Sequence, residues 1–196
     1  GLGISFAAQG VLSNFFAGAL LAVDRPFDVG HWIQIGDEKD FSLYGYVEDL
    51  DMFRTYITTT DYVRYSLPND KVMKSTIINY TRPDERYRVQ FFLKISYDSD
   101  LKLARDIILE TINEYWYLSR ARPIWIYVDD LGDFAVRLRV RLFVPHVRLR
   151  RRAKDFCLRL IKERFEENGI VMPYPTQEVI LGGETPPPVR GEVKAE

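Results

Sequence analysis

The chain has 196 residues, of which 46% are hydrophobic and 28% carry charge, and its formal net charge is -1. This length and composition are those of a folded protein of one or two domains, which excludes wholesale disorder. The near-zero net charge excludes a global attraction to nucleic acid or anionic lipid, although local clusters can still act. One cysteine, Cys157, and two histidines, His31 and His146, cannot form an internal disulfide or a recognisable zinc site. We therefore expect no metal and no cofactor.

The first 25 residues are predicted to form a transmembrane helix. No charged side chain occurs in residues 1–23, and a helix of that length extends about 34 Å, which matches a bilayer core of about 30 Å. Gly3, Ala7 and Gly10 form a stripe of small residues that would allow close contact between helices. We also expect a kink at Gly10. The alternative is a buried helix of a soluble protein.

The second half of this segment has an apolar face. Its apolar residues recur at steps of one and three, as in a helix; they are Val11, Leu12, Phe15, Phe16, Ala19, Leu20 and Val23. Pro26 ends the helix, because proline disfavours helical geometry at the preceding residue. A signal peptide fits poorly, since no basic region precedes the segment and no cleavage site follows it. The chain opens within this segment and without Met, so we expect further residues before it.

Residues 26–82 are predicted to form a small β domain. Short runs rich in β-branched and aromatic residues alternate with turn residues; they occupy residues 32–35, 46–47, 53–60 and 63–67. The polar and acidic residues 36–45 indicate an exposed loop between the first two runs.

Residues 83–175 are predicted to form an α+β domain. A strand at 87–96 and a helix from 101 precede two strands, at 123–128 and 134–144, and a helix at about 147–168. This is the element order of a ferredoxin-like sandwich. Residues 176–182 are predicted to add a short strand, and residues 183–196 to form a disordered tail rich in proline, glycine and charge.

The strongest basic feature lies in this second domain. Arg137, Arg139 and Arg141 alternate along one predicted strand, and Arg148, Arg150, Arg151 and Arg152 follow at the start of the last helix. Because ferredoxin-like folds can bind RNA, an RNA-binding module that uses residues 148–154 is the alternative function. The predicted strands carry no aromatic RNA-binding consensus. We therefore favour a solvated strand face and helix start, and expect no nucleic-acid partner.

The sequence names no enzymatic reaction. It contains no P-loop, dinucleotide fingerprint or nucleophile elbow. Asp129, Asp130 and Asp133 form an acidic turn, which is more often exposed structure than a cation or acid–base site. We expect no catalytic residue and no enzyme.

Six motifs, taken in order, resemble the family of small-conductance, MscS-like mechanosensitive ion channels. Each is short, but their order and spacing beside an uncharged N-terminal segment are specific, and they cover nearly the whole chain to residue 181. The motifs are Gln9-Gly10-x-Leu12-Ser13-Asn14-x-x-Ala17-Gly18, Arg25-Pro26-Phe27-x-x-Gly30, Leu67-Pro68-Asn69, Asn79-Tyr80-Thr81-Arg82, Tyr97-Asp98-Ser99-Asp100 and Gly169-Ile170-x-x-Pro173-Tyr174-Pro175.

The resemblance implies a homo-heptamer in the cell membrane, whose third transmembrane helices line one pore. Leu2 and Phe6 would form the pore constriction, Gly3 and Ala7 would pack against neighbouring helices, and Gly10 would be the kink. Such a channel opens under membrane tension and releases ions and small solutes during hypoosmotic shock. Phe6 departs from the familiar bacterial pattern, which has leucine there.

The resemblance also implies the arrangement of the cytoplasmic part. The β domains would form a ring, and the α+β domains a hollow cage that Arg137, Arg139, Arg141 and the basic start of the last helix would line with positive charge. Residues 176–182 would form a strand of a small oligomeric β-barrel. Membrane lipid and permeating ions and solutes are the other implied partners.

Overall fold

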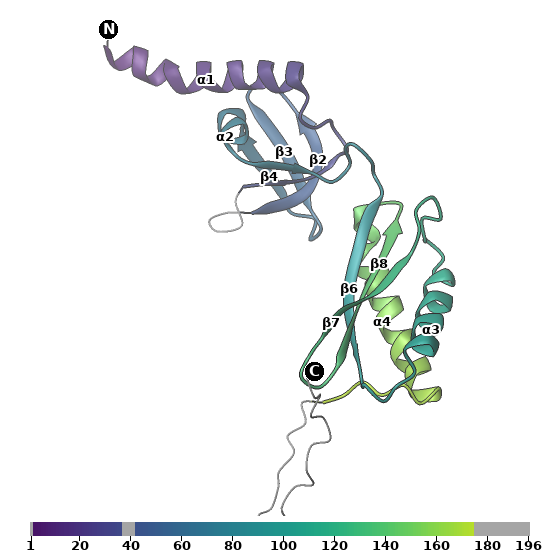
Figure 1. The fold of residues 1–196 in the computed structure, drawn as a ribbon. Coiled ribbons are helices and arrows are strands. Elements are labelled where there is room, and N and C mark those ends of the chain that lie inside the picture. The colour runs from purple at the N-terminus through teal and green to yellow at the C-terminus, as the bar shows by residue number, and fades with distance from the viewer. Residues whose placement is uncertain (1, 37–41, 175–196) are drawn as a thin grey trace, which may run out of the picture.

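The computed structural model describes residues 2–36 and 42–174, with the side chains of residues 2–8 excepted. The described chain forms two sheets, each with its own core, and one long N-terminal helix (Figure 1). Helix α1 (Leu2–Asp24) runs across one end of the five-stranded sheet, beside the short helix α2 (Asn69–Lys74). The three-stranded sheet and its two helices lie at the other end of the molecule.

Helix α1 has the predicted extent and runs through Gly10 without a break. Within the described part of the chain, however, no helix is both long and apolar enough to cross a membrane. The predicted transmembrane span remains a prediction, because the side chains of residues 2–8 in α1 lie outside the described ones.

The five-stranded sheet is antiparallel and has the order β4-β3-β2-β1-β5. Its strands are β1 (Trp32–Ile35), β2 (Leu43–Leu50), β3 (Arg54–Thr59), β4 (Arg64–Pro68) and β5 (Ile77–Asn79). The predicted β unit is thus present, and α2 and β5 are additions to it. Its core takes in one residue of α1, Leu21, together with Phe27, Ile33, Val47 and Ile57. Burial of Leu21 attaches α1 to this sheet.

The three-stranded sheet has the order β6-β8-β7, with β6 (Tyr87–Ile95) and β7 (Trp125–Leu131) both antiparallel to β8 (Val136–Val144). Burial alternates strictly along β8, so that its valines and leucines face the helices and its arginines face away. Helices α3 (Leu101–Asn113) and α4 (Arg150–Glu167) cover the inner face, and the short 3₁₀ helix η1 (Val147–Leu149) precedes α4.

This topology agrees with the first three strands of a ferredoxin-like sandwich. Strands β6 and β7 run in the same direction, are joined through α3 and lie on either side of β8. This arrangement of strands and helix is a split β-α-β unit. The fourth strand would fall at residues 176–182, and that segment, the tail 183–196 and loop residues 37–41 lie outside the described residues. The ferredoxin-like sandwich and the closing barrel therefore remain predictions.

Candidate functional site

Helix α1 is tied to α2 by a hydrogen bond between distant residues. The Oδ1 atom of Asn14 accepts a hydrogen bond from the backbone N–H of Asp70 at 3.1 Å, while its Nδ2 donates to the carbonyl of Gly10 at 2.8 Å. Helix α2 has no capping side chain of its own. Because the first N–H groups of a helix lack internal partners, Asn14 supplies a cap from a different element.

Helix α1 also approaches the sheet too closely for any side chain at Gly18. A Cβ atom there would lie 2.3 Å from the carbonyl oxygen of Met52 and 2.6 Å from Nδ2 of Asn69. Asn69 is fully buried; its Nδ2 donates to the carbonyl of Asp51 and its Oδ1 accepts from the Thr55 hydroxyl, both at 2.9 Å. At Gly18, helix α1 therefore contacts the backbone carbonyl of Met52 and the Asn69 amide, which its own hydrogen bonds hold in place.

The opposite face of α1 is apolar and exposed. Five large side chains of the predicted stripe are between 49% and 77% exposed; they are Val11, Leu12, Phe16, Leu20 and Val23. Ala17 and Leu21, one helical face away, are buried against the sheet. Helix α1 thus has one face bound to the β sheet and one apolar face that residues 2–36 and 42–174 leave open. A contiguous exposed apolar surface of this kind usually contacts lipid or another protein.

The end of α1 is bound to the connection between the two sheets. Arg82 donates from its guanidinium to the carbonyl of Arg25 at 2.8 Å and pairs with Asp28. Asn79 donates to the carbonyl of Pro26 at 2.9 Å, and its Oδ1 accepts from the backbone N–H groups of residues 81 and 82. Two of the sequence motifs, around Pro26 and around Asn79, therefore contact each other through hydrogen bonds.

The segment from His146 through η1 to the first residue of α4 packs against aromatic rings of the five-stranded sheet. The guanidinium of Arg148 lies 5.5 Å from the ring centre of Trp32, and that of Arg150 lies 4.6 Å from the ring of Tyr44. His146 stacks edge-on against Trp32 at 6.1 Å. Burial raises the pKa of Tyr44 and lowers the pKa of His146. Two members of the predicted basic cluster thus join the two sheets, whereas Arg151 and Arg152 are exposed.

The outer face of the three-stranded sheet carries the predicted arginines in a row, but they are not free charges. Asp129, whose side chain is only 6% exposed, lies 2.8 Å from Nε of Arg137 and also pairs with Arg139. Arg141 donates to Gln90 at 2.7 Å and to the Tyr127 hydroxyl at 3.1 Å. The prediction of an exposed acidic turn is wrong for Asp129, because this residue belongs to β7 and its buried carboxylate pairs with two arginines.

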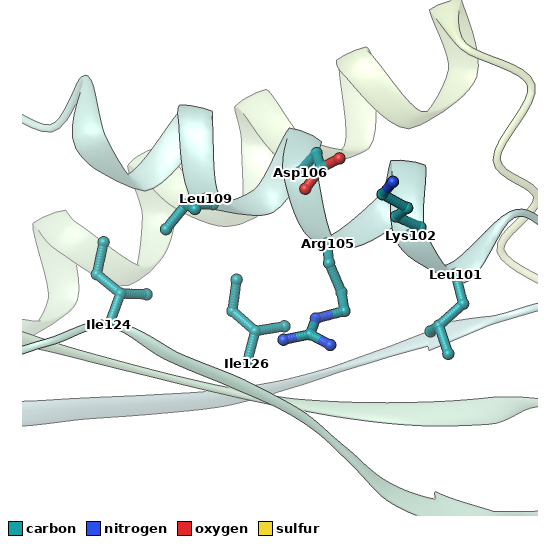
Figure 2. A pocket seen from close by; sticks show the side chains of 7 residues that line it. All are labelled: Leu101, Lys102, Arg105, Asp106, Leu109, Ile124 and Ile126. Atoms are coloured by element: carbon teal, nitrogen blue, oxygen red, sulfur yellow. The ribbon is translucent and has the colours of Figure 1, made fainter.

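A groove of about 520 Å³ runs between α3 and β7. Figure 2 shows Ile124 and Ile126 pointing towards α3, with Leu109 and Arg105 facing them. Its polar side chains, Lys102, Arg105 and Asp106, include no nucleophile paired with a base. Among the described residues, no three His, Cys, Asp or Glu side chains could hold a metal ion.

The predicted pore residues lie in the first turns of α1. Leu2, Gly3, Phe6 and Ala7 belong to the part of α1 whose side chains are not described, so their roles remain predictions. Sequence reasoning missed the roles of Asn14 and Gly18, although both stand in the first motif. Their partners are more than 30 positions away, and no local pattern indicates such a contact.

The chain is similar throughout its described length to mechanosensitive channels. Residues 10–82 match the family model of the mechanosensitive ion channel β-domain, and residues 80–172 match that of the MscS C-terminal domain. The small-conductance mechanosensitive channel MscMJ of Methanocaldococcus jannaschii is 33% identical in an alignment of 186 positions that covers 92% of this chain and 51% of the relative. An uncharacterized MscS family protein of Archaeoglobus fulgidus is 32% identical over 98% of this chain and 65% of its own length.

A solved structure has the same fold. The closed-state crystal structure of Helicobacter pylori MscS superposes with a TM-score of 0.78 at 24% identity, and the match covers 94% of this chain and 70% of that one. The chain spans between half and two thirds of the length of the two archaeal relatives.

Proposed function

Because the chain belongs to the MscS family of mechanosensitive ion channels, we propose that it forms the pore helix and cytoplasmic part of a channel that opens under membrane tension. This family consists of channels and not of enzymes. Release of ions and small solutes during hypoosmotic shock is the proposed role. The alternative of RNA binding through residues 148–154 finds no support among the relatives.

One observation carries the proposal: α1 is fixed to the β sheet on one face and apolar on the other. The capping bond from Asn14 and the close approach at Gly18 attach α1 to the β unit. The exposed face with Val11, Phe16 and Leu20 has no cover among the described residues of the chain. Lipid and neighbouring copies of α1 are the covers we propose, in a homo-heptamer in the cell membrane with the sheets on the cytoplasmic side.

The pore itself would be lined by the first turns of α1. Leu2 and Phe6 are one helical turn apart, so that seven copies would give two stacked apolar rings. A narrow apolar ring blocks ions because water leaves it and an ion would have to shed its hydration. Gly3 and Ala7 would allow close packing of adjacent helices, and Gly10 would provide the kink.

The α+β units would form the walls of a hollow vestibule, closed by a barrel of residues 176–182. Arg137, Arg139 and Arg141 share the outer face of their sheet, and Asp129 offsets part of that charge. Arg148, Arg150, Arg151 and Arg152 add positive charge near the joint of the two sheets. Like charges in a confined space concentrate counter-ions, so a modest preference for anions is proposed.

The proposal is tested on the full-length protein that contains this chain. Native mass spectrometry of the purified protein should give a seven-fold assembly, and membrane patches with the reconstituted protein should conduct only under suction. A stable monomer that binds RNA and carries no current would support the alternative instead.

A further inference from the structure

A hollow between β6 and the start of α4 is rich in cationic residues. It has a volume of about 350 Å³ and is lined by Tyr87, Arg88, Val89, Gln90, Arg150, Arg151 and Lys154. Four of these seven residues carry a positive charge and none carries a negative one. The volume lies at the lower end of the range of about 300–1,000 Å³ that small-molecule sites occupy.

The four cations have no carboxylate partner. Within residues 2–36 and 42–174, no Asp or Glu lies within ion-pair distance of Arg88, Arg150, Arg151 or Lys154. The arginines on the neighbouring sheet face differ, because Arg137 and Arg139 both pair with Asp129 and Arg137 also pairs with Asp130. Clustered like charges repel one another, and a bound anion would remove that repulsion.

Two of the lining residues, Arg150 and Gln90, are held in place by specific contacts. The guanidinium of Arg150 lies over the rings of Tyr44, at 4.6 Å, and Tyr87, at 5.9 Å. The Oε1 atom of Gln90 accepts a hydrogen bond from Nε of Arg141 at 2.7 Å. This bond holds the Gln90 amide beside Arg141, its register partner on β8.

A second hollow nearby shows why the first is the better anion site. It has a volume of about 370 Å³, shares Arg150 and Arg151, and is lined otherwise by residues of the five-stranded sheet and its turns. Asp61 is among those residues, and its carboxylate would repel an anion. The first hollow combines more cations with no acid.

We propose that the hollow between β6 and α4 binds a multivalent oxyanion of the phosphate class. Guanidinium groups match phosphate oxygens with two parallel hydrogen bonds, and a lysine adds a mobile point charge. Because Arg150 also contacts Tyr44 of the other sheet, an anion bound here would stiffen the joint between the two sheets. The occupant could be a soluble phosphate compound or the phosphate of a lipid headgroup, which share this chemistry.

The test is calorimetric titration of pyrophosphate into the purified full-length protein at constant ionic strength. Saturable binding is expected in nanodiscs of phosphatidylcholine. If the binding is lost in nanodiscs of phosphatidylglycerol, a lipid phosphate occupies the site; if it persists, the ligand is a soluble anion.

Two matched double variants distinguish anion binding in the hollow from a general effect of positive charge on the protein surface. Arg151→Gln with Lys154→Gln changes two lining residues, whereas Arg152→Gln with Arg159→Gln removes two exposed charges of the same helix that do not line the hollow. The first variant should bind pyrophosphate at least about tenfold more weakly, which corresponds to the loss of a charge-assisted hydrogen bond. The second should change the affinity less than about threefold.

Equal weakening in both variants, or no saturable binding by the unaltered protein, would overturn the proposal. Melting temperatures without anion verify that both variants fold. If the first variant does not fold, Arg88→Gln on β6 takes its place with the same expected loss. Binding is measured without membrane tension, so its failure leaves the proposed channel function untouched.

Discussion

Asn14 in α1 and Asp70 in α2 are joined by a hydrogen bond of 3.1 Å, although 56 positions separate them in the sequence. A residue of the N-terminal helix thereby caps the first turn of a helix that belongs to the β sheet. This bond and the contact at Gly18 determine how α1 is attached.

Replacing Asn14 with alanine removes this cap. We expect the free energy of unfolding to fall by about 1 kcal/mol, the typical cost of a lost N-terminal cap. Urea unfolding of the purified protein measures this value. Ser13→Ala is the matched control, since the Ser13 side chain makes no hydrogen bond within the described residues; equal losses in both variants would contradict the capping role.

Alanine substitutions at two glycines of α1 distinguish the effect of a steric clash on stability from the effect of helix propensity. Gly18→Ala should destabilise the protein by about 1–3 kcal/mol, because its Cβ would meet the Met52 carbonyl at 2.3 Å. Gly10→Ala should stabilise it by up to about 1 kcal/mol, because a Cβ at Gly10 meets no atom within 4 Å and alanine favours the helix. Melting temperatures that change in the same direction would refute the proposed docking of α1.

Much of the fold follows from periodicity in the sequence, whereas the attachment of α1 does not. The alternating pattern of β8 and the apolar spacing of α3 predict the α+β unit because each element is long and half buried. Helix α2 and strand β5 have only six and three residues, too few for a period to emerge.

The site is predicted less completely than the fold. Arg137 and Arg139 were identified from their alternation, but their partner Asp129 was assigned to an exposed turn. The pairing depends on a register shift between Val128 and Asp130, which places Asp129 beside the arginines. A bulge of this kind leaves no pattern in the residue types.

Asp129→Asn should shift the ion preference of the channel towards anions. Without the carboxylate, Arg139 loses its ion-pair partner and Arg137 keeps only Asp130, so the potential of the proposed vestibule wall becomes more positive. The shift is measured as a reversal potential in a salt gradient at low ionic strength, where screening is weakest. Asp106→Asn on α3 is the control; an equal shift there would show that the outer sheet face does not line the vestibule.

Cys157 reports on the integrity of the α+β core. The thiol is fully buried, and burial raises its pKa from 9.0 to about 12. Because only the thiolate reacts, we expect no labelling by iodoacetamide at pH 8 while the core is intact, and complete labelling in urea. Since the folded pKa is above the unfolded value, the stability contribution of the protonated thiol is lost as the pH rises from 9 towards 12. Rapid labelling of the native protein would contradict the described core.

The central claim, that α1 lines a tension-gated pore with a hydrophobic constriction, is tested most directly by patch recordings of Phe6→Ser in the full-length protein. A polar side chain in the ring would keep water in the constriction. We predict a channel that assembles normally but opens at lower tension than the unaltered protein, or leaks without tension. A well-assembled Phe6→Ser channel with an unchanged threshold and no leak would contradict the account.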